Sequence, residues 1–191
     1  KIKINYLKKN KGDGFCRIYG VRKSKSKIIA FIDSDDIWKK NKLEKQIKFM
    51  KKNKFDFTYT YYSPFKRNRV LSTVNPPSKF NFESFIRDTS IATSSIMVKK
   101  TFLNNIKLSH SPNFEDYYLK CQILKKTKFA YCLKKNLMKY RIKKHSLSKN
   151  KVRNIYWLWK INRQFNKLNF LSSVLSLMLV SYNSLKKYGL K

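Results

Sequence analysis

The sequence is poor in acidic residues, cysteine, histidine, glycine and proline. Its 191 residues include 10 Asp and Glu against 45 Lys and Arg, which gives a formal net charge of +35. The three cysteines form no CxxC pair, and the two histidines form no HExxH pattern. These absences argue against a disulfide framework and a zinc site, and they favour a reducing compartment.

Hydrophobic residues make up 42% of the chain, enough to build a core, so the chain is not a disordered polycation. Its length suits one domain, or one domain with a tail. The positive charge attracts polyanions such as nucleic acid, an anionic membrane or a phosphorylated substrate. Because the lysines are spread over the whole chain, and because the composition fits an AT-rich coding bias, the charge alone indicates little about function.

Strands and helices alternate to about residue 142, which predicts an α/β fold with a mostly parallel sheet flanked by helices. The apolar run 28–32 is typical of a strand that is buried on both faces. Helical spacing predicts helices over 41–52 and 114–126. Further strands are predicted over 55–62, 91–98, 128–133 and 136–142.

Three of the ten acidic residues, Asp33, Asp35 and Asp36, directly follow the predicted strand 28–32. In open α/β sheets, ligands bind beyond the carboxyl ends of the strands. Crowded carboxylates repel one another unless a cation relieves the repulsion. This cluster therefore predicts a Mg²⁺ or Mn²⁺ site that is shared with substrate phosphates. The alternative is that Asp35 or Asp36 caps the helix that follows, which accounts for one acid but not for three.

A second pair of acids, Glu115 and Asp116, opens the predicted helix 114–126. Acidic residues in a first helical turn are favoured by the helix dipole, and this alone could explain the pair. If the first cluster forms an active site, however, that site needs a base. A carboxylate at a helix N-terminus stays ionised and suits that role.

The C-terminal segment 151–191 is predicted to be a helical tail. From Leu168 to Leu185 the chain carries no charge. Helical spacing gives this stretch an apolar face and a polar face, which suits a helix lying in a membrane interface, helped by Trp157 and Trp159. The alternative is a helix that packs on its own domain or on a second subunit. The apolar face comprises Leu171, Val174, Leu175, Met178, Tyr182 and Leu185; the polar face comprises Asn169, Ser172, Ser173, Ser176, Asn183 and Ser184.

Five segments in order make the chain resemble the family 2 glycosyltransferases of GT-A fold. The stretch "KIIAFIDSDDIWKKNKLEKQIKFM" resembles the family's DxD strand and the helix after it, and "FEDYYLKCQILKK" resembles its ED motif. The other three are "NKGDGFCRIYGVRKSKS", "IATSSIMVKK" and "YRIKKHSLSKN". The resemblance covers about residues 1–150, which we expect to form the glycosyltransferase domain.

The resemblance implies an inverting transfer and a role for each matching residue. Asp33 and Asp35 would hold the ribose and the divalent metal, with Asp36 as an alternative metal ligand. Asp116 would be the base for the acceptor hydroxyl, and Glu115 would orient it or the acceptor. Arg17, Arg141 and His145 would contact the nucleotide or its diphosphate. Ile18 stands where the family usually has Asn, and the Gln-x-x-Arg-Trp motif of processive synthases is missing.

The resemblance also implies the partners of the protein. We expect a UDP- or GDP-linked sugar donor and a glycan or lipid-linked acceptor in cell-envelope polysaccharide synthesis. The implied location is the cytoplasm, peripheral on the inner face of the plasma membrane, with no specific nucleic-acid partner.

Two alternatives remain from the sequence. The chain begins at what resembles the third strand of the family, so we expect an N-terminally truncated domain that could be an inactive glycosyltransferase fragment. A basic nucleic-acid-binding module is the other alternative, because positive charge and 15% aromatic residues fit it.

Overall fold

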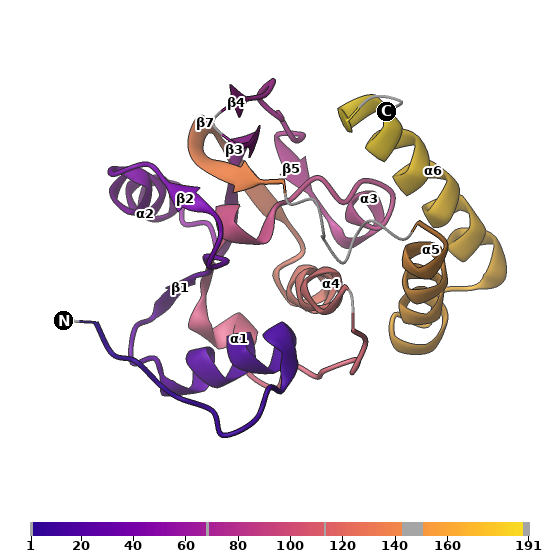
Figure 1. The fold of residues 1–191 in the computed structure, drawn as a ribbon, viewed down its shortest axis with the longest axis horizontal. Helices are drawn as coiled ribbons and strands as arrows, with labels where there is room; N and C mark the ends of the chain where they lie inside the picture. Colours follow the sequence, from indigo (N-terminus) through magenta and orange to yellow (C-terminus); the bar gives the residue numbers. More distant parts are fainter. Residues whose placement is uncertain (1, 68, 113, 143–150, 189–191) are drawn as a thin grey trace.

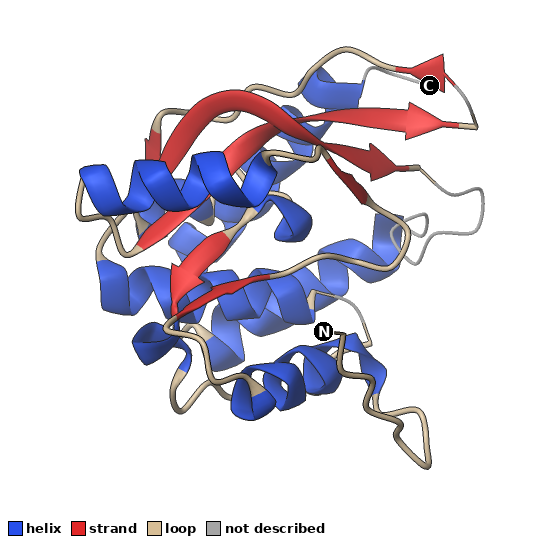
Figure 2. Cartoon of the chain, turned by 90° about the vertical axis from the view of Figure 1, so that its left-hand side faces the viewer, coloured by secondary structure: helices blue, strands red, loops and turns tan. Residues whose placement is uncertain are grey.

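The computed structural model describes residues 2–67, 69–112, 114–142 and 151–188. Figure 1 shows a curled sheet between two helical layers. Helix α2 (Lys42–Lys52) covers one face, and α3 (Phe82–Phe85) and α4 (Glu115–Thr127) cover the other. Figure 2 shows α2 lying across the near face of the sheet. Helix α1 (Gly12–Lys23) packs beside α4, and α5 (Lys151–Lys160) and α6 (Phe170–Tyr188) form an outer layer.

The described strands form a seven-stranded sheet with a central parallel pair, β3 (Phe57–Lys66) and β7 (Ala130–Arg141). The path through the sheet is β1 (Ile28–Ala30), β6 (Met97–Lys99), β3, β7 and β2 (Ile37–Trp38). Strand β4 (Arg69–Val70) pairs with β3, and β5 (Lys79–Phe80) pairs with β7.

The α/β class predicted from the sequence holds, but the strand directions differ from the expected mostly parallel sheet. Among the described strands, only β3 and β7 pair in parallel, although theirs is the longest pairing. Only two residues separate β3 from β4, and so short a connection permits only antiparallel pairing. Strand β6 returns antiparallel between β1 and β3.

Most of the predicted elements form close to their expected bounds, and three differ. The predicted strands 128–133 and 136–142 are one continuous strand, β7, with irregular register against β3. The predicted strand 91–98 contains a 3-10 turn, η1 (Thr93–Ser95), before β6 begins. In space, this turn lies against the loop that comes after β1, and it contributes to the site described below.

A buried polar cluster attaches α2 to the sheet and to the turn η1. Lys42 is fully buried, donates to Gln46 Oε1 at 2.8 Å and lies 4.2 Å above the Trp38 ring. Gln46 Nε2 donates to the Ser95 carbonyl at 3.0 Å and to Thr58 Oγ1 at 3.1 Å. Burial lowers the pKa of Lys42 to about 7. Because these contacts fix Ser95, they also fix the two residues before it.

The apolar core lies on the other face of the sheet, between β3, β7 and the helices α3 and α4. It includes Phe57, Tyr59, Phe85, Ile123 and Ala130, all of which are inaccessible to solvent. Searching the described helices for a segment long and apolar enough to span a bilayer finds none.

Candidate functional site

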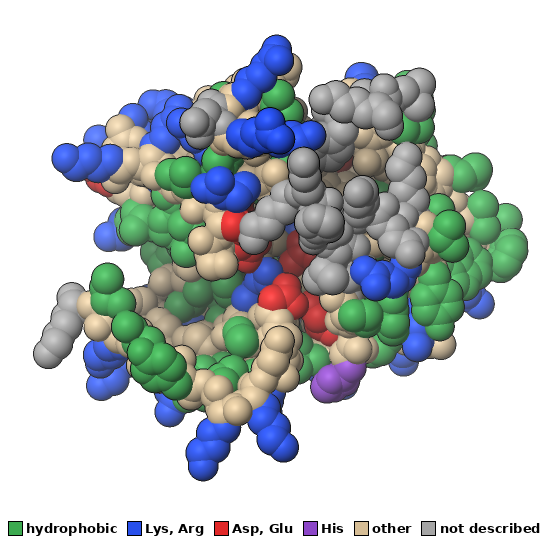
Figure 3. All heavy atoms as spheres, in the orientation of Figure 1, with side chains coloured by type: hydrophobic (Ala, Val, Ile, Leu, Met, Phe, Trp, Pro, Cys, Tyr) green, Lys and Arg blue, Asp and Glu red, His purple; other side chains and the backbone are tan. Residues whose placement is uncertain are grey.

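A cleft of about 1380 Å³ opens where β1 ends, and its wall comes from α1, the loop after β1, the turn η1 and α4. This volume exceeds the range of about 300–1,000 Å³ that is usual for small-ligand pockets. Figure 3 shows carboxylates gathered in a hollow at the centre of one face, on a molecule whose other charges are mostly Lys and Arg. The cleft therefore has room for a large polar ligand.

Asp33 and Asp35 lie on the loop after β1, and both line the cleft. The backbone N–H of Asp33 donates to Ser94 Oγ at 2.9 Å, which holds the loop against η1. The backbone N–H of Asp36 donates to the Asp33 carbonyl at 3.0 Å and closes a tight turn. Of the three aspartates, Asp33 and Asp35 line the cleft and Asp36 does not.

Asp36 is buried and does not line the cleft, so the predicted alternative metal ligand lies behind the cleft wall. Its Oδ1 accepts the backbone N–H of Arg141 at 2.9 Å and so connects the loop to the end of β7. Burial raises the pKa of Asp36, although hydrogen bonds from Ser94 and Arg141 oppose the shift. Asp36 is therefore placed to hold the loop in shape.

Asp116 lines the same cleft as Asp33, from the first turn of α4, and its side chain is 35% exposed. Its Oδ2 accepts from Lys120 Nζ and from Thr93 Oγ1, both at 2.8 Å. Burial raises the pKa of Asp116, but the charges of Lys120 and Arg17 outweigh it and hold this pKa well below its usual range. Asp116 is therefore ionised at neutral pH.

Glu115, the neighbour of Asp116, points away from the cleft and is buried. Its Oε1 accepts Ser109 Oγ at 2.8 Å and the backbone N–H of Ser111 at 3.0 Å. A Cβ placed on Gly14 would lie 2.8 Å from the Glu115 Cβ, so α1 and α4 touch at this point. The role predicted for Glu115, orienting the base or an acceptor, would therefore have to act through packing.

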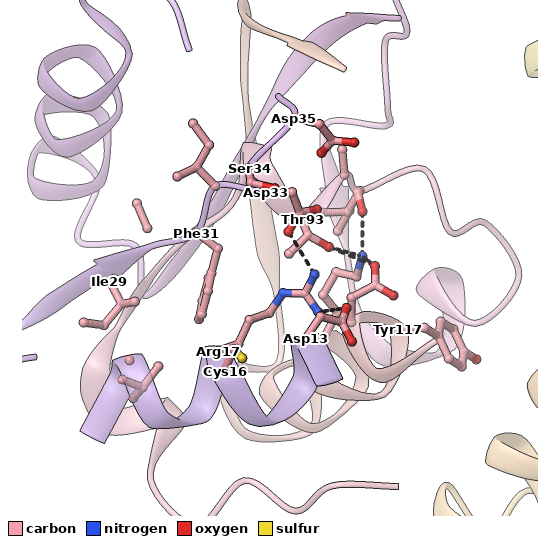
Figure 4. Close-up of a pocket in the computed structure, with 18 of the residues that line it drawn as sticks. Asp13, Cys16, Arg17, Ile29, Phe31, Asp33, Ser34, Asp35, Thr93 and Tyr117 are labelled. Carbon is pink, nitrogen blue, oxygen red and sulfur yellow. Dashed lines mark hydrogen bonds and ion pairs between the residues drawn. The ribbon is translucent and has the colours of Figure 1, made fainter. Parts of the chain in front are cut away.

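Arg17 connects the two sides of the cleft. Figure 4 shows its guanidinium between Asp13 and Asp33, with Nη1 2.6 Å from Asp13 Oδ2 and Nη2 2.9 Å from Asp33 Oδ1. Burial lowers the pKa of Arg17, but the carboxylates of Asp116, Asp33 and Asp13 raise it above its ordinary value. A permanent positive charge therefore lies between the acids of the first and second clusters.

Arg141, at the end of β7, is one of the cations that line the cleft, together with Lys3, Arg17 and Lys120. Its Nε donates to the Asp35 carbonyl at 2.9 Å, and its guanidinium lies 4.4 Å from the Phe65 ring centroid. The structure thus places Arg141, a predicted site residue, at the cleft. His145 lies outside the described residues.

The oxygen ligands at the cleft fit a divalent ion that is only partly held by protein. Among the described residues, no group of three or more His, Cys, Asp or Glu side chains could form a complete metal centre. Mg²⁺ is usually bound by one or two carboxylates, with waters and substrate phosphates completing the shell. Asp33 and Asp35 supply two such hard ligands beside an open cleft.

Four residues of the site were not predicted from the sequence: Asp13, Thr93, Ser94 and Lys120. Lys120 stands four residues after Asp116, and an acid followed by a base at this spacing forms a helical pair, so it carried a usable signal. Thr93 and Ser94 carried no such signal, because they lie within a predicted strand. Their importance comes from the turn η1, which reaches Asp33 with Ser94 and Asp116 with Thr93.

Comparison with known sequences identifies relatives of one kind. A sequence model of the family described as Glycosyl transferase family 2 matches residues 1–130. TuaG of Bacillus subtilis, whose name assigns it to teichuronic acid biosynthesis as a glycosyltransferase, is 27% identical over 98% of this chain and 75% of its own length. The Escherichia coli UDP-Glc:alpha-D-GlcNAc-diphosphoundecaprenol beta-1,3-glucosyltransferase WfgD is 30% identical over 86% of this chain and 65% of its own length.

Comparison with solved structures confirms the predicted GT-A-like fold. A crystal structure of S. aureus TarS in complex with UDP-GlcNAc superimposes on 96% of this chain with a TM-score of 0.67 and 15% sequence identity. The match covers 56% of the TarS chain, so the chain spans little more than half the length of this structural relative. At this level of identity the likeness concerns the fold alone.

Proposed function

Because the chain belongs to glycosyl transferase family 2, we propose that it transfers a sugar from a nucleoside diphosphate to an acceptor hydroxyl with inversion at the anomeric carbon. The names of its relatives include a teichuronic acid enzyme and a glucosyltransferase that acts on a lipid diphosphate. These names support an acceptor in cell-envelope polysaccharide synthesis, carried on a lipid. They also support a UDP-linked donor, with a GDP-linked donor as the second choice to test.

One observation carries the proposal. Asp33 and Asp116, which are far apart in the sequence, line the same cleft, and the turn η1 hydrogen-bonds to both of them. An inverting transfer needs a leaving-group site and a base on opposite sides of one sugar. This arrangement supports such a reaction, because the two acids stand on different elements, the loop after β1 and the first turn of α4, that line one cleft.

The donor side of the cleft is assigned to Asp33, Asp35 and Arg141. The carboxylates would hold the ribose and a divalent ion, and that ion, when bound, neutralises the charge on the departing diphosphate. Arg141, together with Arg17, adds positive charge for the phosphate oxygens. Binding of a doubly charged diphosphate would also loosen the Arg17–Asp33 pair, since both anions compete for one guanidinium.

The acceptor side is assigned to Asp116 as general base. The acceptor oxygen attacks the anomeric carbon as the bond to the diphosphate breaks, and the hydroxyl proton passes to the carboxylate. The hydrogen bonds that described residues donate to the Asp116 carboxylate all go to Oδ2, which leaves Oδ1 for the acceptor hydroxyl. Lys120 keeps the carboxylate ionised and fixed in direction.

The test is a donor screen followed by a base variant. UDP- and GDP-sugars are supplied with Mn²⁺ and a lipid-diphosphate acceptor, and the released nucleoside diphosphate is measured. We expect one donor to be turned over, with a product of inverted anomeric configuration by NMR. Asp116→Asn should remove transfer and leave calorimetric binding of the nucleoside diphosphate near the wild-type value.

Asp56→Asn is the matched control, because Asp56 also pairs with a lysine, Lys99, but lies outside the cleft. It should transfer sugar at the wild-type rate. Full activity of the Asp116 variant would remove the base assignment. A product of retained configuration would overturn the inverting mechanism.

A further inference from the structure

Helix α6 packs on the protein through two buried serines and through Leu177 and Val180, and it exposes most of the apolar side chains of its other side. Ser173 and Ser176 are inaccessible to solvent, whereas Leu171 is 77% exposed and Met178 is 58% exposed. Ser176 Oγ donates to the Ile86 carbonyl and accepts from Asn162 Nδ2 at 2.9 Å. The sequence predicted two faces for this helix, but the alternatives of membrane contact and packing are not exclusive, because each face has its own surroundings.

The buried contacts of α6 fix this orientation. Asn162, itself fully buried, accepts from the Tyr117 hydroxyl at 2.7 Å and so connects α6 to α4. Asn183 Nδ2 donates to the Arg87 carbonyl at 3.1 Å near the other end of the helix. Rotating α6 to bury its exposed leucines, such as Leu171, would break these bonds and leave buried polar groups without partners. Each such group costs about 1–3 kcal/mol.

The exposed apolar side of α6 continues onto α5. The Trp159 and Phe170 rings meet edge to face, 5.5 Å apart, at the junction of the two helices. Figure 3 shows hydrophobic side chains gathered along the edge of the molecule where Figure 1 places α5 and α6. We call this surface the outer apolar face; it comprises Val152, Ile155, Tyr156, Phe170, Leu171, Leu175, Met178, Tyr182 and Leu185.

The charged side chains of α5, of α6 and of the segment between them have one sign. No Asp or Glu follows Asp116 in the sequence. Exposed cations on or beside the two helices include Arg163, Lys167 and Lys186. Lys160 lies 4.8 Å above the Trp157 ring, so aromatic and cationic groups are interleaved. An apolar surface with Tyr side chains, with half-buried Trp side chains and cations beside it, matches the boundary between the headgroups and the acyl chains of an anionic bilayer.

We propose that the outer apolar face of α5 and α6 binds the surface of an anionic membrane, with both helices lying in the plane of the interface. A second copy of the chain is the main competing occupant. It fits less well, because each copy carries a net charge of +35 and the cations around the two faces would repel. This proposal goes beyond the proposed function and can be tested without any donor or acceptor.

The test is sedimentation with lipid vesicles. The chain should bind vesicles of phosphatidylglycerol and phosphatidylcholine, and should bind pure phosphatidylcholine vesicles much more weakly. Replacing Leu171, Met178 and Tyr182 together by Gln should weaken binding to the anionic vesicles by at least about tenfold, because three exposed apolar groups no longer enter the interface. Replacing Arg163 and Lys167 by Gln should weaken it by about fivefold for each charge removed.

The matched control replaces Ile2, Ile4 and Tyr6 by Gln, because these three exposed apolar side chains lie far from α5 and α6. Its vesicle binding should equal that of the wild type, and circular dichroism should show all variants folded. Equal binding by the Leu171, Met178 and Tyr182 variant overturns the proposal. Sedimentation equilibrium that shows a dimer, dissociated by the same three changes, also overturns it and assigns the face to a second copy.

Discussion

The two acidic clusters of this protein, 33–36 and 115–116, are built in the same way on two elements that line one cleft. In the first, Asp33 and Asp35 line the cleft while Asp36 is buried behind it. In the second, Asp116 lines the cleft while Glu115 is buried against a loop. Each cluster therefore has carboxylates that line the cleft and one that is buried, although the sequence gives them no visible distinction.

The division has a physical cause in the backbone partners of the buried acids. Asp36 accepts the N–H of Arg141, and Glu115 accepts the N–H of Ser111. A carboxylate accepting backbone N–H groups stabilises an irregular segment that has no secondary-structure partners. Two acids therefore stand close together for different reasons. One is buried and holds the loop through a backbone N–H, and its neighbour lines the cleft.

The largest expected effect is a difference in transfer rate between a variant of Asp116 and a variant of Glu115. Asp116→Asn removes the proposed base and should lower the rate of transfer by about 10²–10⁴-fold. Glu115→Gln keeps an oxygen for Ser109 and Ser111, so its rate per folded molecule should stay within a few-fold of the wild type. Both are measured as release of nucleoside diphosphate, corrected for the folded fraction by circular dichroism.

An equal loss in both variants would contradict this division of roles. It would mean that Glu115 takes part in the chemistry despite its burial, or that neither acid is the base. Lower nucleotide affinity in Asp116→Asn would point instead to a donor-binding role, which calorimetry in the presence of UDP distinguishes.

A second prediction concerns the contact that holds Glu115 in place. Gly14→Ala puts a methyl group 2.8 Å from the Cβ and Cγ of Glu115 and should destabilise the fold by about 2 kcal/mol through overpacking. Gly20→Ala in the same helix meets no atom within 4 Å, and it should be neutral or stabilise by up to about 1 kcal/mol. Urea unfolding of both variants checks the difference. Equal stability would show that α1 and α4 are not in tight contact here.

A third prediction separates Asp35 from Asp36. Asp35→Ala should weaken Mn²⁺-dependent binding of a nucleoside diphosphate by about tenfold or more while leaving stability within about 0.5 kcal/mol. Asp36→Ala should lower stability by about 1–3 kcal/mol, because a buried N–H of Arg141 loses its acceptor. Calorimetry with and without Mn²⁺ measures the first effect, and urea unfolding measures the second. Reversed effects would exchange the two roles.

The sequence predicted the acidic segments well, because the apolar run before Asp33 and the helical pattern after Glu115 are local signals. It could not say which acid of each pair is buried, because that depends on Arg141, Ser109 and Ser111, which come from other parts of the chain or lie in a loop. The same limit applies to α6. Periodicity separated Leu171 and Met178, which are exposed, from Ser173 and Ser176, which are buried, but only tertiary contacts decide that Ser176 packs inward and that Leu177 packs with it.

The sheet shows the opposite limit. The long central strands were visible as apolar or alternating runs, but strands of two residues such as β2 and β4 are too short to give a pattern. Because both pair antiparallel with their neighbours, the sheet is mixed and not mostly parallel as expected. The turn η1 was hidden for a related reason, since Thr and Ser are common in strands as well as in tight turns.

The smallest predicted effect concerns the pH dependence of stability in metal-free protein, which Asp36 and Asp116 should influence in opposite directions. Burial raises the pKa of Asp36 above 3.8, so the folded state binds its proton more tightly and Asp36 lowers stability as the pH rises through the folded pKa. The pKa of Asp116 is held below 3.8, so Asp116 adds stability that is lost as the pH falls through that value. Relative to the wild type, Asp36→Asn should therefore gain stability as the pH rises above 3.8, and Asp116→Asn should lose less stability than the wild type as the pH falls below 3.8. Urea unfolding at several pH values in a chelator measures both, and a shift of the same sign in the two variants would show that the buried and the cleft-lining carboxylates do not differ in electrostatic environment.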